Sequence, residues 1–222
     1  MAAHFAAVRA RIDAACARAG RSPGDITLVA VTKTHPSHVI AAAFAAGLRD
    51  FGENRVQEAA PKVADLRERG LAPAWHLIGH LQRNKAAAAI DLFDILHSVD
   101  SIRLAETISA HASRPVRVLL EVNVTGELSK FGISPEETPG LAEHIGGMPN
   151  IALTGLMTVA PPVDDPEDAR PVFRTVRQLR DAIGLRELSM GMTGDFEVAV
   201  EEGSTLVRVG RALFGARGEA GH

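Results

Sequence analysis

Short apolar runs alternate with helical patterns from one end of the chain to the other. Two of these runs, 26–32 and 116–122, carry valine, leucine or isoleucine at most of their positions. A half-exposed strand alternates apolar and polar residues, whereas a strand buried on both faces is nearly continuously apolar. Strands of the second kind pair in parallel beneath a cover of helices, so the pattern predicts a repeating strand–helix fold.

The repeat is predicted to contain about eight strand–helix units. We expect strands over residues 26–32, 48–51, 75–78, 93–96, 116–122, 151–156, 187–189 and 205–209. We expect helices over residues 3–19, 37–46, 56–69, 84–90, 101–112, 135–145, 166–183 and 196–202, and a final turn at 211–214. These units fit a single (β/α)8 TIM barrel in the α/β class. The rival is an open doubly wound sheet, but no G-x-G-x-x-G fingerprint follows the first strand. No linker rich in Pro, Gly or Ser divides the chain, so residues 1–222 are predicted to form one domain.

Composition excludes several classes of function. The net charge of -3 and the aromatic share of 4% are unlike those of nucleic-acid-binding proteins. The single cysteine, Cys16, excludes an internal disulfide, and the histidines show no metal-binding spacing. No apolar run approaches the roughly 20 residues of a membrane span. Residues 1–10 also lack the apolar stretch of a signal peptide, so we expect a cytoplasmic protein.

Lys33 follows directly after the first predicted strand. Only four of the 24 basic residues are lysines, so an amine at a strand end is unusual for this chain. In a barrel of parallel strands, the carboxyl ends of the strands carry the chemistry. An amine forms a Schiff base with an aldehyde, and a guanidinium does not. Lys33 is therefore a candidate for covalent attachment of an aldehyde, and the alternative is that it merely begins a surface loop.

The loops after the last two predicted strands have the composition of a phosphate site. Phosphate binding uses backbone N–H donors, glycines that permit close approach, and hydroxyl groups. These loops supply Ser189, Gly191, Thr193, Gly194, Gly210 and Arg211. In such barrels the loops after strands seven and eight frequently bind phosphate. The alternative is an ordinary turn in which Thr193 or Asp195 caps the next helix.

A Schiff-base lysine together with a phosphate site predicts pyridoxal 5'-phosphate (PLP), a phosphorylated aldehyde. Arg208 ends the eighth predicted strand, where it is placed to donate to the pyridine nitrogen. A guanidinium stays charged and only donates, so it would keep that nitrogen unprotonated. A neutral ring is a poor electron sink, which disfavours carbanion chemistry.

Six motifs occur in order and carry a resemblance to a known family. They are AVTKT at 30–34, FGENRVQE at 51–58, WHLIGHLQRNK at 75–85, GLM at 155–157, LSMGMT at 188–193 and VRVG at 207–210. With these motifs the chain resembles the pyridoxal phosphate homeostasis protein family, also called PLP-binding proteins, over essentially its whole length. The resemblance implies the fold of the N-terminal barrel of alanine racemase (fold type III).

The resemblance also implies a set of cofactor-binding residues. PLP is expected on Lys33, surrounded by Asn54, Met157, Ser189, Thr193, Arg208 and Gly210. Thr193 departs from the family, which usually has serine there, but the hydroxyl is retained. The implied role lies in vitamin B6 balance, and no catalytic turnover is established for the family.

The sequence favours a protein that binds PLP and supplies it to apo-enzymes. Racemases of the related fold use a tyrosine from a second, β-rich domain, and this chain has no tyrosine and no room for that domain. The alternatives are a slow PLP-dependent amino-acid racemase or decarboxylase, and an interaction module in which Lys33 is incidental. Lys85 and Lys130 are candidates for transient PLP attachment, or are simply surface charges. We expect a monomer or weak homodimer with no nucleic-acid or membrane partner.

Overall fold

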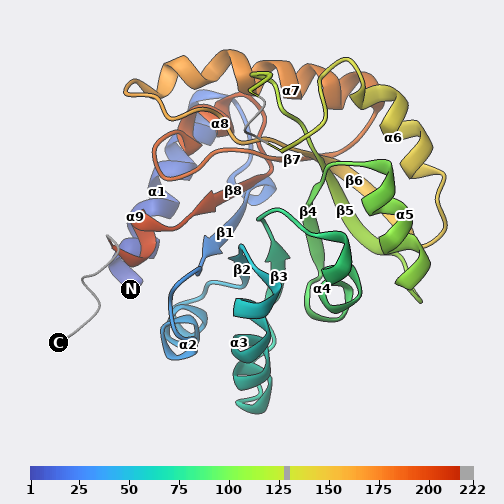
Figure 1. The fold of residues 1–222 in the computed structure, drawn as a ribbon. Coiled ribbons are helices and arrows are strands. Elements are labelled where there is room, and N and C mark those ends of the chain that lie inside the picture. The colour runs from blue at the N-terminus through green and yellow to red at the C-terminus, as the bar shows by residue number, and fades with distance from the viewer. Residues whose placement is uncertain (128–130, 216–222) are drawn as a thin grey trace.

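A computed structural model describes residues 1–127 and 131–215, and its centre is a closed barrel of parallel strands (Figure 1). The strands are β1 (Thr27–Val31), β2 (Asp50–Glu53), β3 (Ala74–Leu77), β4 (Ile95–Val99), β5 (Val116–Glu121), β6 (Ile151–Met157), β7 (Glu187–Ser189) and β8 (Leu206–Val209). Each strand pairs with the next, and β8 pairs with β1, which confirms the predicted (β/α)8 barrel.

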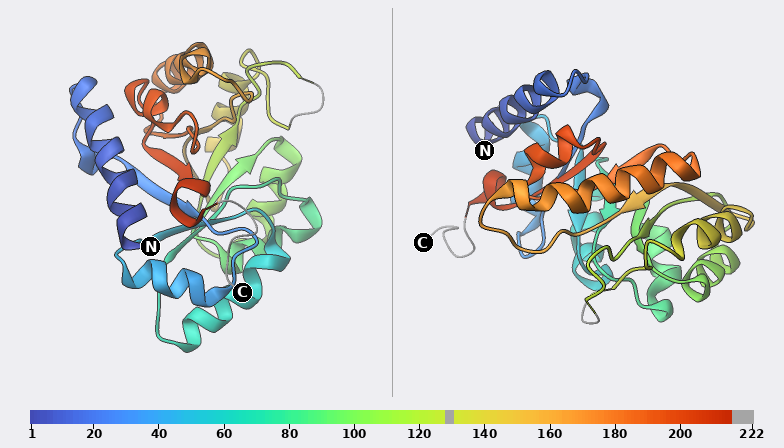
Figure 2. Two further views of the ribbon diagram at one scale, coloured as in Figure 1. Left: turned by 90° about the vertical axis from the view of Figure 1, so that its left-hand side faces the viewer. Right: turned by 90° about the horizontal axis from the view of Figure 1, so that it is seen from above.

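Helices surround the barrel and cover its outer face (Figure 1). They are α1 (Ala2–Arg18), α2 (Ser37–Ala45), α3 (Val56–Glu68), α4 (Ala86–Leu92), α5 (Ile102–His111), α6 (Thr138–Gly146), α7 (Arg170–Ile183), α8 (Phe196–Glu201) and α9 (Arg211–Phe214). Short 3₁₀ turns lie at η1 (Pro23–Asp25), η2 (Arg83–Lys85) and η3 (Pro166–Ala169). Helix α1 precedes the first strand and packs against α8 and α9, next to the end of the described chain (Figure 2).

Two apolar clusters of very different size fill the molecule. The large one includes residues of the helices and most strands, whereas Ile95, Leu119 and Met157 form a separate small cluster. A hydrogen bond of 2.8 Å joins His97 on β4 to Ser189 on β7. Because β4 and β7 are not neighbours in the sheet, this bond crosses the interior of the barrel. The interior is therefore filled partly by polar side chains.

Two strands, β2 and β4, begin two residues later than predicted, because the end of the preceding helix occupies the residues before them. The strand predicted at 48–51 begins at Asp50, since the N–H of Leu48 bonds to Ala43 O and closes α2. The strand predicted at 93–96 is β4, Ile95–Val99, since the N–H of Phe93 bonds to Ala89 O at the end of α4. The second shift places His97 within a strand rather than in the loop after it.

Gly155 occupies an irregular position in the middle of β6. The register between β5 and β6 shifts beside it, as at a β-bulge. A Cβ atom added at Gly155 would lie 2.2 Å from the backbone oxygen of Glu187 on β7. The close approach of these two strands therefore requires a residue without a side chain.

We expect Gly155→Ala to lower the free energy of unfolding by about 1–3 kcal/mol, the usual cost of forcing a methyl group into a filled space. The measurement is urea denaturation. Gly140→Ala is the matched control, because a Cβ atom there meets nothing within 4 Å on the exposed side of α6. That variant should be neutral or slightly more stable. A Gly155→Ala protein as stable as the wild type would contradict this account.

Candidate functional site

A cavity of about 680 Å³ lies at the carboxyl ends of β1, β7 and β8. Its volume is within the ~300–1,000 Å³ range of small-molecule sites. The cavity is lined by Val31, Lys33, Pro161, Pro162, Val163, Met192, Thr193, Gly194, Asp195, Arg208, Gly210 and Arg211. Four of the seven residues predicted to bind a cofactor, Lys33, Thr193, Arg208 and Gly210, are thus brought together in one space.

Lys33 is held at the cavity by a tight turn that follows β1. The N–H of His35 donates to Thr32 O at 3.0 Å across this turn. Thr34 has a φ of 69°, in the left-handed region that β-branched residues rarely adopt. The N–H of Thr34 donates to the carboxylate of Glu58 on α3, which stabilises this strained conformation. The position of Lys33 therefore depends on a residue of the following strand–helix unit.

Lys62 on α3 joins the turn to the end of β2. Its Nζ atom donates to Glu53 Oε1 at 2.8 Å, to Glu58 Oε1 at 2.9 Å and to the backbone oxygen of Thr32 at 3.0 Å. The hydroxyl of Thr32 also donates to Glu53 Oε1, at 2.6 Å. The Lys62 amine is therefore bonded to one buried and one partly exposed carboxylate and lies in a structural network.

The two carboxylates of this network have opposite pKa shifts. Burial raises the pKa of Glu53, and the hydrogen bonds from Lys62 and Thr32 offset only part of that rise. Burial also acts to raise the pKa of Glu58, but the bonds from the Thr34 N–H and Lys62 outweigh it and lower the pKa. The Lys62 ammonium therefore offsets part of the effect of burial on the pKa of Glu53.

The loops after β7 and β8 present unpaired N–H groups to the cavity. Gly191 has a φ of 94°, and a Cβ atom there would lie 2.5 Å from the Cβ of Ala199. Glycine at this position thus allows the chain to turn closely over α8. Within residues 1–127 and 131–215, the backbone N–H groups of four cavity residues donate to no protein acceptor; these are Thr193, Gly194, Gly210 and Arg211. Backbone N–H groups that are left without acceptors around a cavity are the groups that bind anions in proteins.

Arg208 adds a buried positive charge to the cavity, with 4% of its surface exposed. Its Nη1 atom donates to Ser189 Oγ at 2.6 Å, and its Nη2 atom donates to Thr158 O at 2.9 Å. Burial lowers the pKa of the guanidinium to about 10, although Asp195 and Glu121 act in the opposite direction. The side chain therefore remains charged at neutral pH and is held in one orientation.

The remaining three predicted residues lie near the cavity but do not line it. Ser189 is fully buried and bonded to Arg208, and Met157 belongs to the small apolar cluster inside the barrel. Asn54 lines a neighbouring cavity of about 550 Å³, which Lys85 also lines. Among the described side chains, Asn54 Oδ1 is one of the buried oxygens without a hydrogen-bond partner. Lys130 lies outside the described residues.

Sequence reasoning missed the roles of Lys62, Glu58 and Glu121. The spacing of Glu58 and Lys62, four residues apart on a helix, was the available signal for the first two. Glu121 is the only acidic residue of β5, and burial followed by the charge of Asp100 raises its pKa to about 7. It is therefore a candidate for proton transfer near neutral pH.

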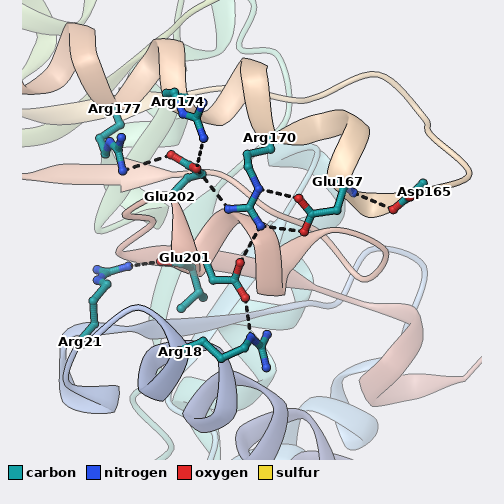
Figure 3. Close-up of polar contacts among 10 residues, drawn as sticks. Arg18, Arg21, Asp165, Glu167, Arg170, Arg174, Arg177, Glu201 and Glu202 are labelled. Carbon is teal, nitrogen blue, oxygen red and sulfur yellow. Dashed lines mark hydrogen bonds and ion pairs between the residues drawn. The ribbon is translucent and has the colours of Figure 1, made fainter.

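An ion-pair network behind the cavity fixes α8 on its neighbours (Figure 3). Glu202 is almost completely buried and lies 3.1 Å from each of Arg170, Arg174 and Arg177 of α7. Glu201 contacts Arg170 at 2.6 Å and Arg18 of α1 at 2.6 Å. Because α8 directly follows the loop at 191–195, this network stabilises one wall of the cavity.

We expect Lys62→Met to lower the free energy of unfolding by about 3–5 kcal/mol at neutral pH, because it leaves the buried Glu53 carboxylate unpaired. The same change raises the pKa of Glu53 further. The folded state then binds more protons than the unfolded state, so the loss should shrink as the pH falls toward about 5. Urea denaturation at several pH values measures this dependence.

The matched control is the double variant Lys62→Met/Glu53→Gln, which removes the charge that was left unpaired. It should recover a large part of the lost stability at neutral pH. A loss in Lys62→Met that does not change with pH would contradict the role of the Glu53 charge.

The structure also bears on metal binding and on membrane-spanning helices. Among residues 1–127 and 131–215, no group of His, Cys, Asp and Glu side chains is arranged to hold a metal ion. Each helix in the same part of the chain is too short or too polar to span a bilayer.

Comparisons with known proteins agree with this architecture. The family model for the N-terminal domain of alanine racemase matches residues 4–218. The pyridoxal phosphate homeostasis protein of Pseudomonas aeruginosa is 44% identical over 222 residues, covering 98% of this chain and 96% of that protein. The structure of PipY from Synechococcus elongatus with PLP bound has a TM-score of 0.82 and 36% identity, covering 96% of this chain and 99% of that one.

A more distant structure shares the fold alone. Alanine racemase from Corynebacterium glutamicum has a TM-score of 0.68 and 22% identity, and the match covers 97% of this chain but 62% of the racemase. Near-full-length identity of 44% and the match to the family model are decisive. The chain belongs to the pyridoxal phosphate homeostasis proteins, within the family of the alanine racemase N-terminal domain.

Proposed function

We propose that this protein binds PLP in the cavity at the ends of β1, β7 and β8 and takes part in vitamin B6 homeostasis. The observation that carries the proposal is the meeting of a lysine amine, a buried arginine and four N–H groups around one cavity, and the described part of the chain offers these N–H groups no acceptor. The name of the Pseudomonas aeruginosa relative and the PLP in the PipY structure support the same ligand.

The residues around the cavity fit the two reactive ends of PLP. When bound, PLP supplies an aldehyde that condenses with an amine, releasing water. Lys33 is the amine that lines the cavity, and it would hold the cofactor as a Schiff base. The N–H groups of Thr193, Gly194, Gly210 and Arg211 would bind the phosphate.

Arg208 would face the pyridine nitrogen of the ring. Its bonds to Ser189 and Thr158 fix the guanidinium, which donates but does not accept. Its pKa of about 10 keeps it charged at neutral pH, so the ring nitrogen would stay unprotonated. This arrangement opposes carbanion chemistry and favours storage of the cofactor over turnover.

Asn54, Met157 and Ser189 are assigned secondary roles in the same site. The buried oxygen of Asn54 accepts from no donor among the described residues, and a ligand would supply one. Met157 would act by packing within the barrel, and Ser189 would act through Arg208. We further infer that the holo-protein supplies PLP to apo-enzymes in the cytoplasm, as a monomer or weak homodimer.

The second candidate function is a slow PLP-dependent racemase or decarboxylase of amino acids. It is favoured by Glu121, whose pKa of about 7 suits proton transfer at neutral pH. The chain has no tyrosine to act as a second base of the racemase type. The carrier function therefore remains our proposal.

Reduction of the PLP-saturated protein with borohydride should fix the label on the peptide that contains Lys33. We expect Lys33→Ala to lose this label, because no other amine lines the same cavity among the described residues. Peptide mass mapping makes the measurement. Lys85→Ala, which alters the neighbouring cavity, is the control and should keep the label on Lys33. A label that persists unchanged in Lys33→Ala would refute the proposed site.

We also expect the holo-protein to exchange amino-acid α-protons for deuterium no faster than free PLP does, because a neutral ring stabilises carbanions poorly. Incubation with single enantiomers of amino acids in deuterated water, followed by NMR, measures the exchange. Glu121→Gln is the matched variant. Fast exchange in the wild type that is lost in Glu121→Gln would establish the enzyme alternative instead.

A further inference from the structure

A chain of four hydrogen bonds runs through the barrel from Arg208 to Asp50. Arg208 Nη1 donates to Ser189 Oγ at 2.6 Å, and Ser189 Oγ lies 2.8 Å from His97 Nδ1. His97 Nε2 lies 2.9 Å from His76 Nδ1, and His76 Nε2 lies 3.1 Å from Asp50 Oδ1. His76, His97 and Ser189 are each 0% exposed.

The chain connects the two ends of the barrel. Arg208 lines the cavity that contains Lys33, at the carboxyl ends of the strands. Asp50 and His76 line a second cavity, of about 160 Å³, at the amino ends. The Asp50 side chain is 30% exposed there. A group in contact with solvent at one end is thus joined to a buried cation at the other.

The positions of the protons along the chain follow from counting donors and acceptors. Arg208 only donates, so Ser189 Oγ accepts from it, and an ionised Asp50 only accepts, so His76 Nε2 donates to it. As long as the His97 ring is neutral, two arrangements satisfy both ends. In the first, both histidines are neutral with the proton on Nε2, and the Ser189 hydroxyl donates to His97. In the second, His76 is doubly protonated, and His97 donates from Nδ1 to Ser189.

The second arrangement carries two penalties. Ser189 Oγ would receive two donors, and its own hydrogen would find no acceptor in the described part of the chain. It would also place a positive charge on the fully buried His76, and the desolvation cost of such a charge opposes its attraction to Asp50 at 3.1 Å. In the first arrangement every donor in the chain has an acceptor and every bond points from Arg208 toward Asp50.

The environment of His97 excludes a third arrangement, in which the His97 ring is charged. Burial, followed by the nearby His76, Arg208 and Arg117, holds the pKa of His97 well below its ordinary value. The ring is therefore neutral and carries one proton. The hydroxyl of Ser189 needs an acceptor, which places that proton on Nε2 and leaves Nδ1 to accept.

We propose that Asp50, His76 and His97 are positioning residues that act through Ser189 on Arg208. They make the Ser189 oxygen the acceptor of the Arg208 Nη1–H group. In this way they determine which other N–H groups of the guanidinium are left to donate to a ligand in the cavity. The effect on PLP rests on the proposed function, whereas the direction of the hydrogen bonds does not.

Nitrogen NMR of the full chain with isotope-labelled histidine, recorded without cofactor, tests the direction of the bonds. We expect His76 and His97 to be neutral, with the proton on Nε2 in both rings. A proton on Nδ1 of either ring, or a charged His76, would overturn the assignment.

The substitution Asp50→Ala tests the coupling to Arg208. It removes the final acceptor at a partly exposed position, so it opens no hole in the core. We expect the histidine tautomers and the Nε–H resonance of Arg208 to shift. The PLP dissociation constant should rise about fivefold, the equivalent of one hydrogen bond. Asp25→Ala is the control, because Asp25 lines the same cavity but is exposed and outside the chain of bonds.

The outcomes separate the two proposals. Unchanged tautomers and an unchanged Arg208 resonance in Asp50→Ala would overturn the positioning role, whatever the protein binds. Equal changes of the tautomers and of the Arg208 resonance in Asp25→Ala would overturn the positioning role too. They would show that the loss of a negative charge at the cavity near Asp50, and not the loss of a hydrogen bond, causes the effect. A wild type that binds no PLP refutes the proposed function, and the NMR result still decides the positioning role.

Discussion

The pairing of β8 with β1 is the constraint on which the rest of the structure depends. It closes the barrel with Val29 opposite Arg208, so that two residues far apart in the sequence share one edge. Gly210 then lies next to Val31 at the carboxyl ends of these strands, and Lys33 and Gly210 line one cavity. An open sheet of the same strands would separate the amine from the arginine by the width of the sheet.

Closure of the barrel also explains why its polar interior is stable. A buried polar group is costly only when it lacks a partner. Ser189 is bonded to Arg208 and His97, and His97 is bonded to His76. The same principle applies outside the barrel interior, where Lys62 donates hydrogen bonds to two carboxylates and a backbone oxygen. Hydrogen bonds from residues outside the cavity thus hold the charged side chains that line it. Ser189 positions Arg208, and Lys62 holds the turn that carries Lys33.

Much of the fold and part of the site could be predicted from the sequence. Nearly continuous apolar strands require helices on the outer face, and eight such units favour a closed barrel. Because the carboxyl ends of parallel strands meet, Lys33, Thr193, Arg208 and Gly210 could be expected near one another. The histidine chain could not be predicted, because a bond between His97 and Ser189 depends on side-chain directions across the barrel. The predicted start of β4 was wrong for a related reason. The end of α4, and with it the start of β4, depends on a single backbone hydrogen bond from Phe93 to Ala89.

The packing of α1 against α8 and α9 has a consequence for the order of events during synthesis. Arg11 bonds to Glu197 and Arg18 bonds to Glu201, so the first helix is attached to the last part of the described chain. While β8 is still inside the ribosome, β1 keeps an unpaired edge, and α1 lacks the surface it covers. The barrel therefore closes after translation of β8, and the cavity that residues of β1 and β8 line together forms only then. The cavity is thus a property of the finished barrel, and until the barrel closes the unpaired edge of β1 is a site at which chains can aggregate.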